Sequence, residues 1–370
     1  GLVTLGRMAA FDGELLSRFH GRDCAAAYSR AARRITSEGN AIANAGGGLG
    51  ARGTSAVSGF AVPAVGSEKV VTTSIGVAGA GAAGITLGAT ANVISSVTDA
   101  RIGDSARVNQ GGGTVGDVKV SATDDTFMVM AAGTVAGAAA AAVSGSSNTA
   151  VVNKQTSATV ADADVNGTNI RVAAAASEEL YIATANVSGA GIAGVGAAVG
   201  VGTVQNTTIA GIKAGAVVDV TGDLRVTAGQ DTSMDLYTAA GAGGVVGVSG
   251  AVSVGVVDNT TRAFVEGAGS AAFAANINAG GTTEVAATSK EELSSITISA
   301  AVGGVGVAGS VGVKVLESET TASIGDNVRV NQTRGGAAQD VKVSATDTVA
   351  LKGGGGAGGG GVFAGVGAIS

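Results

Sequence analysis

The chain has 370 residues, of which 64 are glycine, 45% are hydrophobic, 14% are charged and 3% are aromatic, and its formal net charge is −6. Tryptophan is absent and proline occurs once, so the chain lacks the usual volume fillers of a multidomain core. A positive mean hydropathy excludes a disordered chain, and the lack of a three-residue glycine period excludes collagen.

The charge is unevenly distributed. Residues 1–52 contain seven arginines and four acidic residues, whereas residues 53–370 contain 15 basic and 24 acidic residues. A long acidic body argues against binding of nucleic acid along its length.

Cys24 is the single cysteine, so an intrachain disulfide is excluded. No signal-peptide pattern opens the sequence, which we interpret as a piece of a longer protein.

Residues 1–65 are predicted to form an N-terminal segment that is partly helical. Hydrophobic residues and arginines are interspersed over residues 11–37, and no glycine follows Arg22 in this stretch. This pattern predicts a helix over residues 11–37. Such a segment would cap a stack of repeats or contact another subunit.

Residues 66–370 contain an internal repeat, predicted as five β-repeats followed by a truncated sixth. Residues 117–124 (DVKVSATD) are identical to residues 340–347. A valine marker and an alanine marker both recur at spacings of 52 to 59 residues, which makes chance a poor explanation. The valines are Val120, Val172, Val226, Val285 and Val343, and the alanines are Ala100, Ala158, Ala210, Ala263 and Ala322.

Each unit is predicted to consist of a long Gly/Ala/Val run, a polar break with paired threonines, a short strand, a variable Gly/Asn turn and an Asp-Val-Lys-Val strand. Valine alternates with small residues in the runs, as in residues 252–256 (VSVGV), which is the period of a β-strand. We expect the valine face to fill the interior and the small face to allow close packing. The predicted fold is all-β, a β-solenoid-like stack of about 55-residue units with a short N-terminal helical segment.

This order of motifs resembles that of the large repetitive filamentous adhesins, including the leukotoxin-like family of Gram-negative surface exoproteins. The resemblance lies in residues 257–263 (VDNTTRA), residues 322–326 (ASIGD) and the two DVKVSATD copies, and it covers about residues 66–370. It implies secretion to the bacterial surface, a fibrous β-rich shaft, and adhesion or cell–cell contact.

Two motifs with chemical meaning occur only in part. Residues 79–84 (GAGAAG) and 304–309 (GVGVAG) fit G-x-G-x-x-G, but a dinucleotide site needs a helix after the glycines, and further strand sequence follows here. His20 and Cys24 are four residues apart, and two side chains are fewer than a metal site needs. We therefore predict no catalytic, cofactor-binding or metal-binding residues, and no enzyme.

Acidic residues recur after each Asp-Val-x-Val strand. We interpret them as solvated turn charges that discourage edge pairing, in preference to a Ca²⁺-binding ladder. They are Asp124, Asp125, Glu178, Glu179, Asp231, Glu291, Glu292 and Asp347. The threonine pairs at 207/208, 260/261 and 320/321 are expected to satisfy backbone groups at the polar break. Glycans on the turns remain an alternative because sequons occur at Asn166, Asn186, Asn206, Asn259 and Asn331.

The predicted function is that of a structural repeat segment of an extracellular bacterial fibre or adhesin, which self-associates and mediates surface attachment or cell–cell contact. The expected partners are copies of the chain, in a filament or lateral assembly, and a host or neighbouring cell surface. Neither nucleic acid nor a membrane is expected. The alternative is a membrane-disrupting, leukotoxin-like exoprotein, which the family resemblance and the glycine-rich runs favour.

Overall fold

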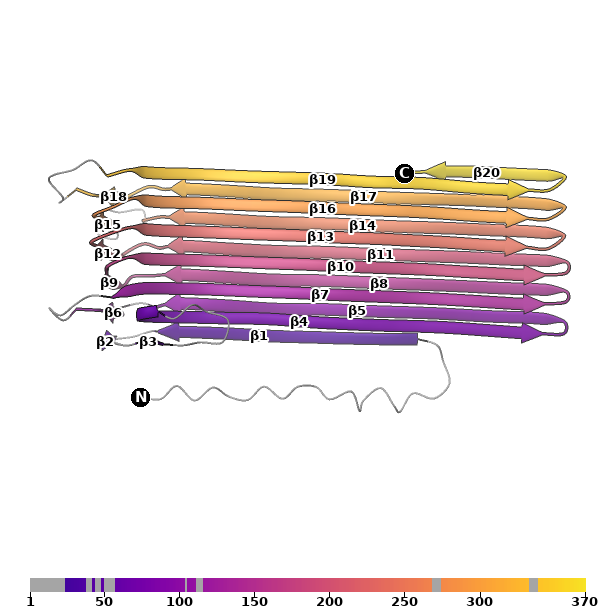
Figure 1. Ribbon diagram of the computed structural model, residues 1–370, viewed down its shortest axis with the longest axis horizontal. Helices are drawn as coiled ribbons and strands as arrows, with labels where there is room; N and C mark the ends of the chain where they lie inside the picture. Colours follow the sequence, from indigo (N-terminus) through magenta and orange to yellow (C-terminus); the bar gives the residue numbers. More distant parts are fainter. Residues whose placement is uncertain are drawn as a thin grey trace.

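The computed structural model describes residues 24–37, 42–43, 48–49, 57–103, 105–110, 116–267, 274–332 and 339–370. Over these residues the protein is all-β and contains no helix. The strands form three sheets in which equivalent strands of successive repeats lie next to one another, almost always in parallel (Figure 1). The predicted stack of β-solenoid type is therefore confirmed.

Each complete coil contains a long forward strand, a two-residue bend, a long return strand and a short strand at the corner (Figure 1). The forward strands are β4 (Val57–Ala80), β7 (Asp117–Ala138), β10 (Ile170–Ala190), β13 (Leu224–Gly243), β16 (Thr283–Val302) and β19 (Val341–Gly360). The return strands are β5 (Ala83–Ile102), β8 (Ala141–Val160), β11 (Ala193–Ile212), β14 (Val246–Val265), β17 (Val305–Ile324) and β20 (Phe363–Ile369). The short strands are β6 (Arg107–Val108), β9 (Asp164–Gly167), β12 (Val217–Val220), β15 (Ala275–Ala279) and β18 (Val328–Val330).

The first strands of the chain join the same sheets. Strand β1 (Cys24–Ser37) pairs with β5, β2 (Ile42–Ala43) pairs with β6, and β3 (Gly48–Leu49) pairs antiparallel with β4. The predicted helix over residues 11–37 is therefore wrong for its second half, while residues 11–23 lie outside the described residues. The physical reason is that β5 supplies a full ladder of backbone hydrogen bonds, and such tertiary pairing outweighs a local preference for helix.

Both sequence markers lie in register through the stack. The valine marker Val172 lies opposite Val120 on one side and Val226 on the other, and the alanine marker Ala210 lies opposite Ala158 and Ala263. The same pairing continues to the last complete coil. Differences in repeat length fall mainly in the corner between a return strand and the next forward strand. The return strands β5, β8, β11, β14 and β17 are each 20 residues long.

The interior differs along the strands, and we call the part beside the short strands proximal and the part beside the bends distal. The proximal interior is enclosed by all three sheets. In the coil of β10 to β12, Val172 from the forward strand, Ala210 from the return strand and Val218 from the short strand are all 0% exposed. These positions form one continuous apolar core along the stack.

In the distal part the valine face points outwards, so the prediction that valines fill the interior is wrong there. In β14, Val248 is 38% exposed, whereas Ser249 and Ser253 are 4% and 0% exposed. At the consecutive valines Val256 and Val257, valine passes from the outward-facing to the inward-facing positions of the strand, because Val257 is buried and Val256 is only partly buried. Valines are therefore inside on the proximal side of this dipeptide and outside on its distal side.

Close approach of the two sheets explains the small distal interior. A two-residue bend can separate the strands that it joins by no more than roughly 11 Å. At Gly194, near the start of β11, a Cβ atom would lie 2.3 Å from the carbonyl oxygen of Gly243 in the forward sheet. At Gly200 a Cβ atom would lie 2.7 Å from Thr238 Oγ1 of the facing sheet. Large side chains therefore do not fit between the sheets here.

Hydrogen bonds between the sheets take the place of large apolar contacts. Asn148 Nδ2 donates to the carbonyl oxygen of Ala183 at 2.6 Å, and Ser188 Oγ donates to the carbonyl oxygen of Ala142 at 2.7 Å. The hydroxyl of Ser253 lies 2.6 Å from those of Ser295 and Thr297. These bonds satisfy polar side chains that the close packing removes from water.

Two adjacent residues of β14 test this inverted arrangement. We expect Ser253→Val to lower the free energy of unfolding by about 1–3 kcal/mol, because it adds volume to a filled site and leaves two buried hydroxyls without a partner. The reciprocal change, Val252→Ser, should cost less than about 1 kcal/mol because this side chain lies on the outer face. Chemical denaturation checks both, and a larger loss for Val252→Ser would contradict the inverted interior.

Candidate functional site

The return sheet presents an unbroken row of β-branched side chains in its distal half. Ile85 lies opposite Val143, which is followed in register by Val195, Val248 and Val307. Their exposed fractions lie between 37% for Val143 and 69% for Ile85. Neighbouring rungs are about 4.8 Å apart, the spacing of strands in a sheet. We call this row the valine ladder.

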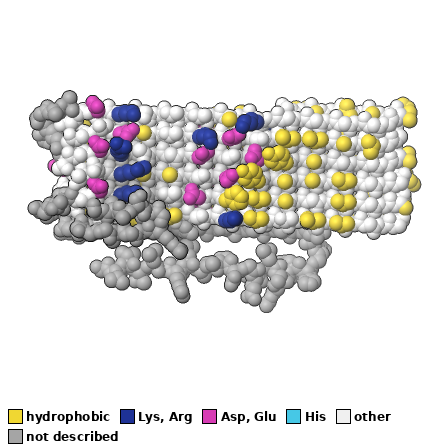
Figure 2. Space-filling view, in the orientation of Figure 1, with side chains coloured by type: hydrophobic (Ala, Val, Ile, Leu, Met, Phe, Trp, Pro, Cys, Tyr) yellow, Lys and Arg dark blue, Asp and Glu magenta, His cyan; other side chains and the backbone are white. Residues whose placement is uncertain are grey.

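Further apolar side chains surround the valine ladder and also cover the distal half of the forward sheet. On the return sheet they are Leu87, Val199, Val246 and Val305. On the forward sheet they are Val71, Ile75, Val77, Val135, Val187, Ile296, Ile298 and Val302. Figure 2 shows the forward face, where hydrophobic side chains gather toward the bends, and charged side chains lie both near the short strands and at mid-strand.

The size of the return-sheet surface indicates what it can do. Its distal half covers about ten residues on five strands, or roughly 800 Å². Monomeric soluble proteins rarely expose apolar patches above about 600 Å², whereas one partner of a standard protein interface buries about 800 Å². A flat surface of this size and regularity suits association with another flat, regular surface.

A layer of buried charges crosses the interior at mid-strand. Lys154, on β8, is 2% exposed, and its Nζ lies 2.5 Å from Asp124 Oδ1, 3.3 Å from Glu68 Oε2 and 3.8 Å from Glu178 Oε1. The three carboxylates come from the forward strands of three successive coils. Lys154 Nζ also donates to Thr126 Oγ1 at 2.6 Å. One ammonium group therefore faces three carboxyl groups.

Along the stack, the acidic residues of this layer alternate with threonines. The register runs from Glu68 to Thr126, Glu178, Thr232 and Glu291. Carboxyl groups in this ladder are thus two rungs apart, or roughly 10 Å, instead of directly opposite each other. Since like charges on directly opposite residues destabilise a sheet, the alternation lowers the repulsion within the stack.

Burial shifts the protonation of these carboxyl groups. Burial raises the pKa of the Glu178 carboxyl to about 8, although the Lys154 ammonium and the Thr232 hydroxyl lower it by a smaller amount. Burial also raises the pKa of Glu68 and of Glu291. Asp124 is the nearest carboxylate to Lys154, and its second oxygen accepts hydrogen bonds from Thr98 at 2.8 Å and Ser96 at 3.2 Å. The lysine is therefore paired first with Asp124, while Glu178 keeps its proton at neutral pH.

The acidic residues that the sequence placed at a turn lie within the long strands. Asp124, Glu178 and Glu291 are buried, whereas Asp125 and Glu179 face solvent. The interpretation as solvated turn charges is wrong for the three buried residues. Two consecutive acidic residues in a strand point to opposite sides of the sheet, so each acidic pair contributes one side chain to the interior.

The paired threonines also lie within strands and not at a break. Thr208 and Thr261 are 0% exposed, and their hydroxyls donate to Gln230 Oε1 at 3.1 and 3.3 Å. They satisfy a buried side chain instead of the backbone groups that were expected. The sequons at Asn186, Asn206 and Asn259 are at most 3% exposed, so these three side chains are not accessible to a glycan.

The remaining motifs lie in strands and bends or outside the described residues. Residues 79–84 cross the bend between β4 and β5, and residues 304–309 begin in the next-to-last bend and continue into β17, so strands follow both glycine patterns. His20 lies outside the described residues, and Cys24 begins β1. The described part of the chain contains no group of three metal-ligating side chains. Nor does it contain a helix long and apolar enough to cross a membrane.

Sequence reasoning missed the outward valines and the buried lysine. The signal that could have located the former is the Val-Val dipeptide, which breaks the alternation inside an otherwise regular strand. Comparison with protein-family models, curated proteins and solved structures finds no match to this chain. Its function is therefore argued from the residues and their geometry.

The buried lysine gives a first prediction for this site. We expect Lys154→Met to lower the free energy of unfolding by about 3–5 kcal/mol, because it leaves Asp124 buried without its counter-charge. Lys290→Met is the matched control, since Lys290 pairs with Asp231 on the exposed outer face and should change stability by less than about 1 kcal/mol. Equal effects of the two changes in chemical denaturation would contradict a structural role for the buried pair.

The raised pKa of Glu178 gives a second prediction. Between pH 4.5 and about 8 the folded protein keeps a proton that the unfolded chain releases, so the free energy of unfolding falls as the pH rises through this window. We expect Glu178→Gln to reduce this slope and to stabilise the protein most above pH 8. Glu179→Gln, the exposed neighbour, should leave the slope unchanged. Unfolding curves at pH 5 and pH 8.5 measure the difference, and parallel behaviour of both variants would contradict the assignment.

Proposed function

We propose that this chain is a structural repeat segment of an extracellular bacterial fibre or adhesin that self-associates and mediates surface attachment or cell–cell contact. This function requires an extended scaffold and a surface for association, and it requires no catalysis. The valine ladder is the observation that carries this proposal, because it exposes on a rigid sheet what other proteins bury.

A second copy of the chain is the occupant that best fits the valine ladder. The ladder repeats once per strand, and a partner can place its own side chains between these rungs along the whole surface only if it has the same repeat. Flat β-surfaces with equal spacing interdigitate in this way in dry sheet-to-sheet interfaces. Another copy has the same spacing because it has the same repeat. The exposed apolar area of its return sheet matches the area that one partner buries in a stable interface.

The extracellular bacterial setting rests on the resemblance to the filamentous adhesins. Residues 257–263 lie in the proximal half of β14, and the two DVKVSATD copies occupy equivalent places, where the chain enters the forward strands β7 and β19. A stack with equivalent positions in register supports the role of a shaft, since each further coil repeats the same strand arrangement.

Charged substitutions in the valine ladder test self-association. We expect the wild-type chain to associate laterally with rising concentration, and the double variant Val195→Lys/Val248→Lys to reduce the apparent association constant at least tenfold by burying two charges in the interface. Sedimentation velocity over a concentration series, with electron microscopy of the same samples, gives the result.

The control for this experiment carries two lysines on the same two strands and the same face, outside the apolar surface. Gln205→Lys/Thr260→Lys adds the same charge in the proximal half of β11 and β14 and should associate as the wild type does. A wild-type chain that stays monomeric at high concentration, or a control that loses association equally, would refute the proposal.

The same apolar surfaces are the observation that favours the alternative function, a membrane-disrupting exoprotein. In that case the surfaces would contact lipid instead of another copy. Release of a trapped dye from vesicles separates the two functions, because a shaft leaves vesicles intact. Leakage that Val195→Lys/Val248→Lys abolishes would support the alternative.

A further inference from the structure

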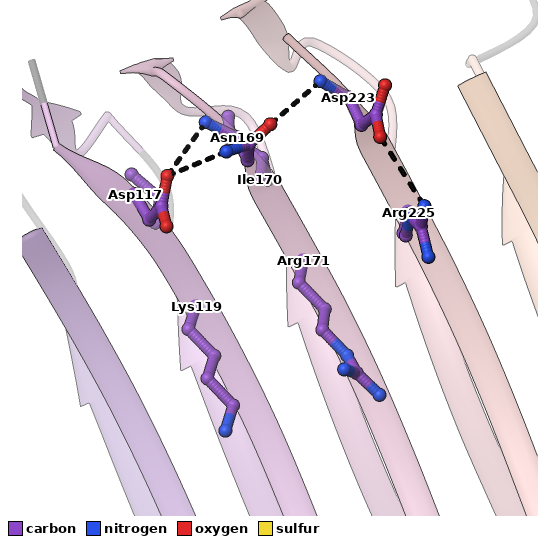
Figure 3. A pocket seen from close by; sticks show the side chains of 8 residues that line it. Asp117, Lys119, Asn169, Ile170, Arg171, Asp223 and Arg225 are labelled. Carbon is purple, nitrogen blue, oxygen red and sulfur yellow. Dashed lines mark hydrogen bonds and ion pairs between the residues drawn. The ribbon is translucent and has the colours of Figure 1, made fainter. Parts of the chain in front are cut away.

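A shallow groove lies on the outer face of the forward sheet, where β7, β10 and β13 leave the corner of the stack (Figure 3). Its volume is about 360 Å³, and it crosses three successive coils. One side is formed by Asp117, Asn169 and Asp223, and the other by the long side chains of Lys119, Arg171 and Arg225 (Figure 3). The groove therefore runs along the stack and perpendicular to the strands.

The polar side of the groove is a chain of hydrogen bonds between coils. Asp117 Oδ1 accepts from Asn169 Nδ2 at 2.9 Å, Asn169 Oδ1 accepts from the backbone amide of Asp223 at 3.0 Å, and Asp223 Oδ1 accepts from the backbone amide of Thr282 at 2.9 Å. These bonds fix the coils relative to one another. They also occupy one oxygen of each carboxylate. The second oxygen of Asp223 accepts from Arg225 Nη2 at 3.4 Å, whereas that of Asp117 can accept a further hydrogen bond.

The cationic side places three positive charges on directly opposite residues. Lys119 pairs in register with Arg171, and Arg171 with Arg225. Among the described residues, Arg225 has acidic partners in Asp223 at 3.4 Å and Glu284 at 3.9 Å, whereas Lys119 and Arg171 have no such partner. Like charges on directly opposite residues destabilise a sheet. The neighbouring cations Lys119 and Arg171 therefore cost stability in the absence of an anion.

Other ladders of the same sheet separate their like charges. Asp125 and Asp231 on the outer face have Ser177 between them. The next rungs of the cation ladder itself show how the repulsion can be removed: Glu284 lies between Arg225 and Lys342 and forms an ion pair with each, at 3.9 and 3.7 Å. A carboxylate between neighbouring cations is thus the solution that the stack uses where it supplies one itself.

We propose that the rungs at Lys119, Arg171 and Arg225 bind the carboxylates of an acidic polysaccharide, a polyuronate chain lying along the groove. The guanidinium groups match carboxylates in bidentate geometry. A sugar hydroxyl can donate to the second carboxylate oxygen of Asp117. The groove contains no aromatic side chain on which a base could stack, and an inorganic polyphosphate carries no sugar hydroxyl to donate to Asp117.

This ligand would be the attachment partner in the proposed function, and the inference rests on that function. It is nevertheless tested independently, because the groove lies in the proximal half of the forward sheet and the valine ladder lies in the distal half of the return sheet. If the wild-type chain self-associates but does not bind polyuronate, the groove proposal alone is refuted. If it binds polyuronate but does not self-associate, only the association proposed for the valine ladder is refuted.

The experiment measures binding of polygalacturonate oligomers to the full chain by calorimetry at low ionic strength. The same oligomers with methyl-esterified carboxyls should not bind, because the esters carry no charge. We expect Lys119→Gln/Arg171→Gln to weaken binding at least tenfold. The matched control, Lys290→Gln/Lys352→Gln, removes two cations from the same outer face that already pair with Asp231 and Glu292, and it should bind as the wild type does.

A second variant guards against loss of binding through misfolding. Arg171→Glu places a carboxylate between two cations, as Glu284 does, so it should abolish binding while leaving the thermal midpoint unchanged or higher. Equal weakening by the control pair would show that only net charge matters and would overturn the site. Equal binding of dextran sulfate or single-stranded DNA at matched charge would overturn the assignment to carboxylates, and binding of the esterified oligomer would do the same.

Discussion

The distance between the forward and return sheets governs the rest of this structure. Two-residue bends join the sheets in every coil, and the side chains beside the bends are small because larger ones would meet the backbone or side chains of the opposite sheet. With no room inside, the β-branched residues that favour a strand must lie outside. The exposed valines are therefore a consequence of the bend, as are the serine and asparagine hydrogen bonds that hold the distal interior together.

The sequence was sufficient to predict the repeat, its register and the class of fold. Val172 and Ala210 lie opposite their counterparts because an unbroken stack of parallel strands must pair equivalent residues. The side to which valines point could not be derived from alternation, since a period of two gives no reference for inside or outside. Nor could the position of the bend: Gly/Ala-rich sequence continues through Gly191 without change, whereas the acidic pairs resemble a turn and lie in mid-strand.

Register has opposite consequences for neutral and charged residues. Threonines, asparagines and valines gain from lying opposite their own kind, but a charge in every coil would meet its repeat at each rung. The interior avoids this because Glu178 lies between two threonines in its ladder and because Lys154 forms an ion pair with Asp124. These residues were not predicted as buried because a sequence shows the charge of a residue and not the partner that a neighbouring coil provides.

The proportions of a coil limit what such a chain can build. Its long strands extend over 20 residues, roughly 65 Å, whereas each added coil lengthens the stack by only about 4.8 Å. The width of the stack is fixed by the strand length, and each added coil extends only the length, so the stack is a wide ribbon whose flanks exceed its tips in area. The flanks are therefore the surfaces on which such a ribbon can bind a partner, and every coil adds one more rung in register to them.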